Sequence, residues 1–152
     1  MVAEPDITMI LADYAAVADG KLVVVGAGWN VNRAPAPCSI GGLLKVPWST
    51  DEASHSYHLV LELVDEDGQP FMILSDDGNR MPLRAAIDIA LQQPPGVPMG
   101  VGVNYPFAFN FGPVPYERPK RYTWQLYLDG DTKDAWRASF IAIEMAQQEQ
   151  AS

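Results

Sequence analysis

Few side chains of the kind that carry out catalysis or bind metals occur in this chain, and their spacing does not bring them together. His55 and His58 are the only histidines, and Cys38 is the only cysteine. In a strand, residues three positions apart point to opposite faces, so the two imidazoles cannot bind one metal ion together. One thiol and two separated imidazoles also fall short of the four ligands of a closed zinc site. We therefore expect no metal site and no cofactor, and we interpret Cys38 as a small buried apolar residue.

Two segments are similar to known ligand-binding loops but lack the residues on which those loops depend. Residues 26–28 (Gly-Ala-Gly) follow an apolar run, yet a dinucleotide fingerprint needs a third glycine and a following helix, which the next residues do not supply. Residues 129–134 carry three acids near the spacing of a calcium loop, but Phe140 stands where that loop needs glutamate. We interpret the first segment as a bend at a strand end and the second as a solvated turn. No nucleophile is paired with a base, so we expect no catalytic residues and a protein that is not an enzyme.

Two tryptophans are the best candidates for ligand contact. Trp29 and Trp48 lie at the ends of apolar runs near prolines, where an indole can cap the core or line a pocket. Core packing is the interpretation that we favour for both, with ligand contact as the alternative. The acidic residues at 51–52, 65–67 and 76–77 lie among turn-forming residues, where acids are common without any catalytic role.

The elements that must position these side chains are strands, because apolar residues alternate with a period of two. This pattern occurs at residues 57–64, 105–111, 122–128 and 136–143. Asp-Gly pairs, which favour hairpins and turns, separate the apolar runs at residues 19–20, 67–68, 77–78 and 129–130. Residues 83–91 fit both a strand and a helical stripe, and we favour the strand because its surroundings are all-β. We predict one all-β domain over residues 1–152, an antiparallel β-sandwich of about seven to nine strands with little or no helix.

Residues 93–119 form a proline- and aromatic-rich segment that holds seven of the 13 prolines. Proline cannot donate to a β-ladder, so a central strand is not expected across most of it. One interpretation is an ordered, proline-stiffened loop that packs its aromatics on the core. The other is an extended arm that docks on another subunit, since aromatic strips are typical of contact surfaces. The interface residues in that case are Tyr105, Phe107, Phe109, Phe111 and Tyr116.

Composition sets the broad class of the protein. The chain has 152 residues, 48% of them hydrophobic, and a formal net charge of -9 at pH 7. Such a chain can bury a substantial core, and its acidity disfavours binding to nucleic acid or to an anionic membrane surface. No apolar run approaches the ~20 residues of a membrane helix, and the N-terminus lacks the basic and apolar regions of a signal peptide. We expect a cytoplasmic protein, with residues 146–152 as a flexible tail.

The chain resembles an uncharacterised family of small β-sandwich proteins, a domain of unknown function, from actinobacteria and their phages. The resemblance rests first on residues 11–29, in which an apolar strand leads through Asp-Gly-Lys-Leu to Gly-Ala-Gly-Trp. Further similar segments are residues 40–48, 61–68 and 121–126. It extends from about residue 7 to residue 143 and is weakest at residues 93–119. The resemblance implies a compact β-sandwich without catalytic residues, located in the virion if the protein is encoded by a phage.

These observations favour a non-enzymatic interaction or structural module. We expect it to form a homo-oligomer or to sit on a larger assembly, such as a phage virion, with a second copy or another protein as its partner. One alternative is a small-molecule or carbohydrate binder that uses Trp29, Trp48 and nearby tyrosines. The other is a hydrolase that uses His55 or His58 with an acid.

Overall fold

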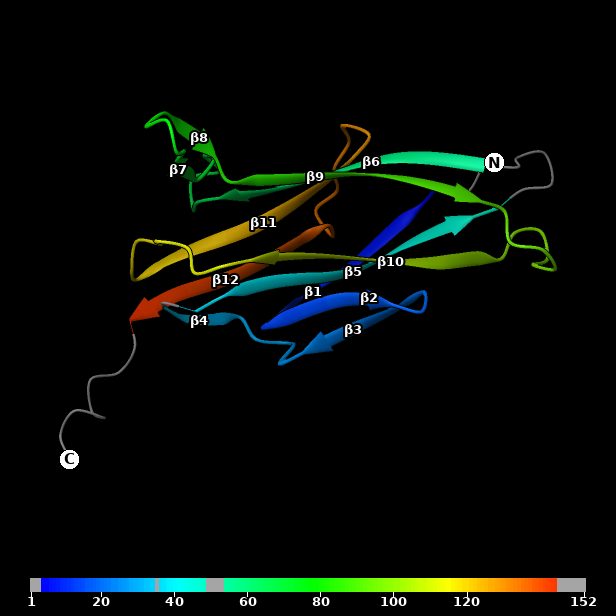
Figure 1. The fold of residues 1–152 in the computed structure, drawn as a ribbon, viewed down its shortest axis with the longest axis horizontal. Coiled ribbons are helices and arrows are strands. Elements are labelled where there is room, and N and C mark those ends of the chain that lie inside the picture. The colour runs from blue at the N-terminus through cyan, green and yellow to red at the C-terminus, as the bar shows by residue number, and fades with distance from the viewer. Residues whose placement is uncertain (1–3, 35, 49–53, 145–152) are drawn as a thin grey trace.

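The computed structural model describes residues 4–34, 36–48 and 54–144, and all regular secondary structure in these ranges is β-strand (Figure 1). No helix there is long and apolar enough to cross a membrane. The strands are β1 (Asp6–Ala12), β2 (Tyr14–Ala18), β3 (Lys21–Val25), β4 (Val31–Ala34), β5 (Cys38–Pro47), β6 (Ser54–Val64), β7 (Met72–Leu74), β8 (Arg80–Pro82), β9 (Arg84–Gln92), β10 (Gly102–Phe111), β11 (Lys120–Leu128) and β12 (Arg137–Glu144). The prediction of an all-β chain is therefore confirmed.

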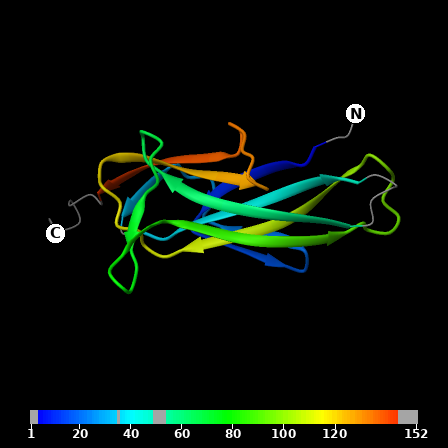
Figure 2. The ribbon, with the colours of Figure 1, turned by 90° about the horizontal axis from the view of Figure 1, so that it is seen from above.

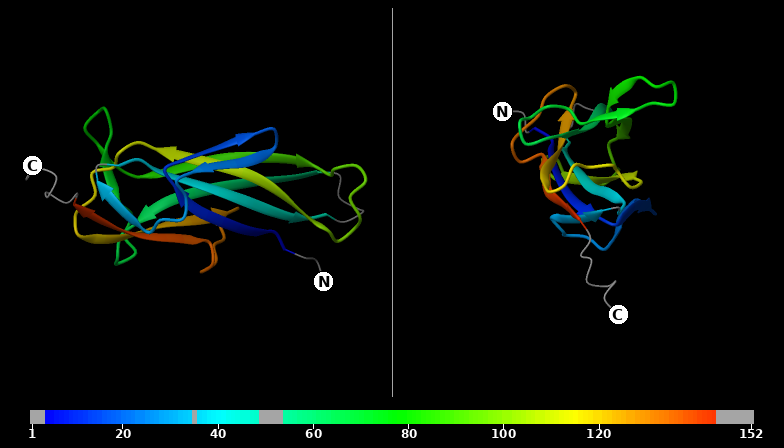
Figure 3. Two further views of the ribbon diagram at one scale, coloured as in Figure 1. Left: turned by 90° about the horizontal axis from the view of Figure 1, so that it is seen from below. Right: turned by 90° about the vertical axis from the view of Figure 1, so that its left-hand side faces the viewer.

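The strands form two large sheets and two hairpins. One sheet has three strands in the order β1-β5-β10, and the other has five in the order β4-β12-β11-β6-β9. Both sheets contribute to one core, in which the Phe111 ring of β10 stacks on the Trp124 ring of β11 with their centroids 4.5 Å apart. Their long strands run along the length of the molecule (Figure 2). The β7–β8 hairpin projects at one end (Figure 3).

This arrangement is more elaborate than the predicted sandwich of seven to nine antiparallel strands. The described residues form twelve strands, and β4 pairs with β12 in parallel, whereas the other pairs are antiparallel. The extra strands are short, with three residues each in β7 and β8 and four in β4. Segments this short do not produce a recognisable alternation in the sequence. Residues 84–92 form β9, so the strand favoured over a helix at residues 83–91 is confirmed.

The middle of the proline-rich segment is a strand, which differs from the predicted loop or arm. Residues 102–111 form β10 and pair with β5 along their whole length. Because β10 lies at an edge of its sheet, Pro106 can occupy it without removing a hydrogen bond from a central ladder. The odd-numbered aromatics of β10 face the core. The predicted tail at residues 146–152 and the acidic pair at residues 51–52 lie outside the described residues.

The hairpin predicted from the Asp-Gly pair at residues 19–20 is confirmed, because β2 and β3 pair on either side of it. Asp19 and Gly20 have φ values of 52° and 69°, the left-handed conformation that a tight two-residue hairpin turn requires. The hairpin lies over the outer face of β5 and β10, where Val24 and Leu22 pack on Gly41. A Cβ atom on Gly41 would lie 2.8 Å from Val24 Cγ1, so the glycine allows the hairpin to approach this closely.

A side-chain amide holds the hairpin to the sheet. The backbone N–H of Ala15 donates to Asn110 Oδ1 at 3.1 Å, and Asn110 Nδ2 donates to the carbonyl oxygen of Ala15 at 2.7 Å. The Ser39 hydroxyl also donates to Asn110 Oδ1, at 2.6 Å. Asn110 of β10 thus satisfies the same backbone groups of β2 that a neighbouring strand would satisfy.

The inner face of β5 has a second close approach. The aromatic ring of Phe107 lies over Gly42, its partner across the β5–β10 pair, and occupies the space that a Cβ atom on Gly42 would need. Protein cores are packed too densely to absorb even one added methyl group without a shift of neighbouring atoms.

We predict that Gly42→Ala destabilises the protein by about 1–3 kcal/mol, because the new methyl group displaces the Phe107 ring. The measurement is the urea midpoint of unfolding. Gly112→Ala is the matched control, since no atom lies within 4 Å of a Cβ built at Gly112. Its effect should stay within about 0.5 kcal/mol. Equal midpoints for the two variants would show that the Phe107 ring does not constrain this position.

Candidate functional site

The two tryptophans suggested for ligand binding lie in different environments. Trp48 is buried at the end of β5, where its indole N–H donates to the Tyr105 hydroxyl at 3.0 Å and its ring packs on His55 with centroids 4.7 Å apart. Trp29 is only partly buried in the connection from β3 to β4, with its ring edge-on to Phe140 at 5.9 Å. Trp48 is therefore a core residue, and Trp29 remains as the candidate for ligand contact.

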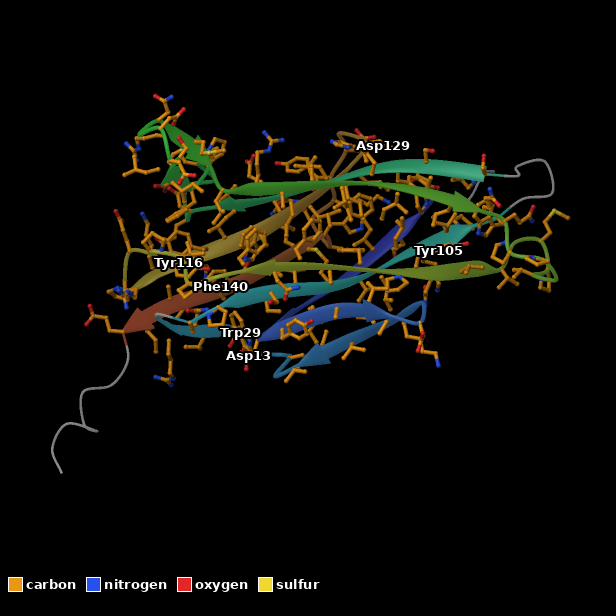
Figure 4. All side chains as sticks on the ribbon, in the orientation of Figure 1. Asp13, Trp29, Tyr105, Tyr116, Asp129 and Phe140 are labelled. Carbon is orange, nitrogen blue, oxygen red and sulfur yellow. The ribbon has the colours of Figure 1, made fainter. Side chains whose placement is uncertain are left out.

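Trp29 lines a surface cleft of about 260 Å³ between the ends of several strands. We call it the Trp29 cleft, and its lining residues are Asp13, Trp29, Val31, Asn32, Arg33, Ala36 and Pro37. Asp13 joins β1 to β2, Asn32 belongs to β4, and Pro37 precedes β5. Asp13 and Trp29 lie close together, although the β2–β3 hairpin separates them in the sequence (Figure 4).

A sharp bend at residues 26–28 brings these segments together, as the sequence predicted. Gly26 and Gly28 have φ values of 61° and 94°, which favour glycine. The Asp13 N–H donates to the carbonyl oxygens of Val25 and Gly26 at 3.0 and 3.1 Å, and the Gly28 N–H donates to that of Leu11 at 2.8 Å. A side chain on Gly26 would overlap the Asp13 carboxylate. The bend therefore places Asp13 beside the chain that leads into Trp29.

Two residues that line the Trp29 cleft each have a buried polar atom without a partner. Asn32 is 3% exposed, and its side-chain oxygen Oδ1 accepts no hydrogen bond from any described residue. The indole nitrogen of Trp29 is also buried, and it too has no hydrogen-bond acceptor within the described ranges. Buried polar groups are nearly always hydrogen-bonded, so an unpaired amide oxygen and an unpaired N–H on two residues of one cleft need an explanation.

The rim of the cleft has one charge of each sign. Asp13 and Arg33 are both exposed, and no ion pair is formed by either among the residues that the structure describes. Val31, Ala36 and Pro37 add apolar surface. The Trp29 cleft therefore combines an aromatic ring, apolar walls, a carboxylate, a guanidinium and two unpaired polar groups.

The predicted interface aromatics face the interior of the subunit. Phe107, Phe109 and Tyr116 are buried, and Tyr105 and Phe111 are half-buried against the core. The strip is therefore not an accessible contact surface in the folded chain. Sequence alternation identified one apolar face of this segment, but alternation does not tell whether that face meets the core or a partner.

A different apolar surface is exposed, on the outer face of the β2–β3 hairpin. Tyr14, Val23 and Val25 are 52%, 43% and 56% exposed. Both faces of this hairpin are apolar in sequence, so the pattern gave no indication of which one would face solvent.

The histidines lie on opposite faces of β6, as their spacing predicted. His55 packs on Trp48, whereas His58 Nδ1 lies 2.7 Å from the Asp88 carboxylate on the outer face of the five-stranded sheet. The His58 and Asp88 side chains are 52% and 85% exposed. This pair is open to water instead of enclosed with a substrate. Among the described residues, no group of three His, Cys, Asp or Glu could hold a metal ion.

Cys38 is fully buried beside the Trp124 indole and the Tyr116 hydroxyl, which confirms its interpretation as a buried residue. Burial away from water disfavours the thiolate and raises the pKa of Cys38 to about 11. The thiolate is the reactive form of cysteine, so this thiol is poorly suited to nucleophilic chemistry.

One family of known proteins includes this chain. The model of the Family of unknown function (DUF6941) matches residues 7–139, and the chain therefore belongs to that family. No curated protein sequence matches the chain.

We predict that Asn32→Val stabilises the protein by about 1–3 kcal/mol, because the change removes a buried amide oxygen that has no hydrogen-bond partner. Valine also favours the strand conformation of β4. Urea unfolding monitored by circular dichroism measures the change. Asn104→Val is the control, since Asn104 is an exposed residue of β10. A loss of stability in Asn32→Val alone would mean that the native amide is satisfied by a tightly held water molecule.

A second prediction concerns pH. The folded protein holds the Cys38 proton up to about pH 11, whereas an unfolded thiol loses it near pH 9, so stability falls as the pH rises between these values. From pH 8 to pH 10 the wild type should lose about 1 kcal/mol more than Cys38→Ala. Urea unfolding at both pH values measures this difference. Parallel pH profiles would contradict the assignment.

Proposed function

We propose that this member of the DUF6941 family is a non-enzymatic interaction module that pairs with a second copy of itself through the free edge of β3. The observation that carries the proposal is an exposed apolar hairpin face next to an unpaired strand edge. The resemblance to proteins of actinobacteria and their phages supports one biological role for this pair, as a component of a larger assembly such as a virion.

The apolar face follows from the register of the hairpin. Tyr14 pairs with Val25 and Ala16 pairs with Val23, so these side chains share one face. The opposite face carries Val24, which packs on Gly41 of the sheet below. Tyr14, Val23 and Val25 therefore point away from the molecule, and clustered exposed apolar residues of this kind are typical of contact surfaces.

The edge of β3 is open along the same hairpin. In an antiparallel pair, backbone groups point alternately toward and away from the partner strand. The backbone N–H and C=O of Ala15 point away from β3, toward Asn110. The backbone groups of Val24, which pairs with Ala15, therefore point away from β2, toward the outer edge of β3. Leu22, two residues earlier, has the same orientation. Its backbone groups and those of Val24 make no hydrogen bond outside the hairpin within the described ranges, and β3 lies at the margin of the molecule (Figure 1).

A second copy can satisfy this edge by symmetric pairing. Two β3 strands run antiparallel across a twofold axis at Val23, with Leu22 of each copy bonded to Val24 of the other. The two hairpins then form a four-stranded ribbon that places the Val23 side chains together on one face. Exposed edges commonly take up a strand in this way, and a twofold interface uses the same residues on both copies.

Net charge opposes the pairing and makes it sensitive to salt. Each copy has a formal net charge of -9, so two copies repel one another. Added salt screens that repulsion. Association should therefore strengthen as sodium chloride is raised, whereas an interface built on ion pairs would weaken.

The test is sedimentation velocity over a range of protein and salt concentrations. The wild type should dimerise, and Val23→Lys should weaken association by at least about tenfold, because two ammonium groups meet at the twofold axis. Leu74→Lys is the matched control, since Leu74 is an equally apolar, exposed residue on the separate β7–β8 hairpin. A wild type that stays monomeric at high protein and salt concentration, or equal effects of the two lysines, would overturn the proposal.

A further inference from the structure

We infer that the Trp29 cleft binds a single neutral sugar ring. The inference does not depend on pairing through β3, because the residues of the cleft are not those whose backbone groups form the open edge. It rests on three features of the cleft, namely its unpaired polar groups, its balanced charge and its size.

The unpaired polar groups define what the ligand must offer. The Trp29 indole N–H is a donor and needs an acceptor, whereas Asn32 Oδ1 is an acceptor and needs a donor. A hydroxyl group is both donor and acceptor, so a ligand that carries several hydroxyls can satisfy both groups with the same chemistry. A carboxylate or an ammonium group would satisfy only one of them.

The rim supports a neutral ligand. Asp13 and Arg33 have opposite charges, so together they give no net preference for an anion or a cation. Each can bond a hydroxyl, the carboxylate as acceptor and the guanidinium as donor. The Trp29 ring with Val31 and Pro37 provides the apolar surface that the C–H face of a sugar ring contacts.

The size of the cleft restricts the ligand to about one ring. Its volume of about 260 Å³ lies just below the roughly 300–1,000 Å³ of most ligand clefts. The cleft is at the surface, so one ring can enter while the rest of a longer saccharide stays in water. A free monosaccharide and the terminal residue of a glycan present the same chemistry to it.

Binding requires a small rearrangement of the cleft. The Trp29 nitrogen and Asn32 Oδ1 are both covered in the free protein, so a hydroxyl reaches them only when the neighbouring side chains rotate. Side-chain rotations of this kind are common on binding. The environment of the Trp29 ring must therefore change when a sugar enters.

The chain has four tryptophans, which allows a direct test on the whole chain. Each is replaced by 5-fluorotryptophan, and the four ¹⁹F resonances are assigned with single Trp→Phe variants. Glucose, galactose, mannose, rhamnose and N-acetylglucosamine are then titrated in turn, with glycerol as the control for a non-specific polyol. Trp48, Trp124 and Trp136 are buried and serve as internal references.

We expect at least one sugar to shift the Trp29 resonance in a saturable manner and to leave the three references unchanged. Asn32→Val should lower the affinity for that sugar by at least about tenfold, whereas Asn104→Val should bind it with the affinity of the wild type. Val23→Lys should also bind normally, which separates this inference from dimerisation.

The source of the ligand is read from a second titration. A disaccharide that ends in the preferred sugar and binds as well as the free sugar identifies a glycan chain end, and binding of the free sugar alone identifies a monosaccharide. The inference is wrong if no sugar shifts the Trp29 resonance, if all four resonances shift together as with glycerol, or if folded Asn32→Val binds as tightly as the wild type.

Discussion

The fold depends on a strand that is covered on both faces at one point. Gly41 and Gly42 are adjacent residues of β5 that have no side chains. Side chains of other strands occupy the space that a Cβ atom would need at each glycine, one on each face of β5. The Phe107 ring fills the inner side, and Val24 of the β2–β3 hairpin fills the outer side. Larger residues here would separate the sheet from the core or the hairpin from the sheet.

This double coverage determines where the surface features lie. Because Val24 packs against Gly41, its neighbours Val23 and Val25 on the other face of β3 are directed toward solvent. The strand cannot bury this second apolar face without losing the contact of Val24. Asn110 occupies the other edge of the hairpin, so only the β3 edge stays open. The bend at residues 26–28 follows directly after β3, and Trp29 of the cleft comes next, so the position of the hairpin also sets the position of these residues. Packing at two glycines thus positions both the proposed contact edge and the proposed binding site.

Local patterns in the sequence predicted the features that depend on local chemistry. The all-β class, the Asp19-Gly20 hairpin and the opposite orientation of the histidines follow from period-two alternation or from turn propensity. The strand predicted at residues 83–91 also needed its all-β surroundings, because its own pattern fits a helix as well. Burial of Cys38 follows from the usual behaviour of a lone thiol.

The features that the sequence did not predict depend on partners that are distant in the chain. Pro106 argued against a strand, yet β10 lies at a sheet edge, which only the full strand order reveals. The hydrogen bonds of Asn110 go to Ala15, which lies in a different part of the sequence, so no local pattern indicates them. Asn32 is a polar residue in a proline-rich stretch, where an exposed loop is the natural expectation. Nothing local distinguishes the core-facing aromatics of β10 from a contact strip.

The parallel pairing of β4 with β12 has a consequence for the order in which the molecule forms during synthesis. Asn32 pairs with Ala142, which lies 110 positions further along the chain. The ribosome must therefore release nearly all of the described chain before β4 acquires its neighbour, and such distant pairings form late. The two strands of the β2–β3 hairpin are close in sequence and can pair early, whereas the hairpin docks on the sheet only after Asn110 of β10 is made. That docking still precedes the pairing of β4 with β12, so a nascent chain acquires its open β3 edge before it completes the Trp29 cleft.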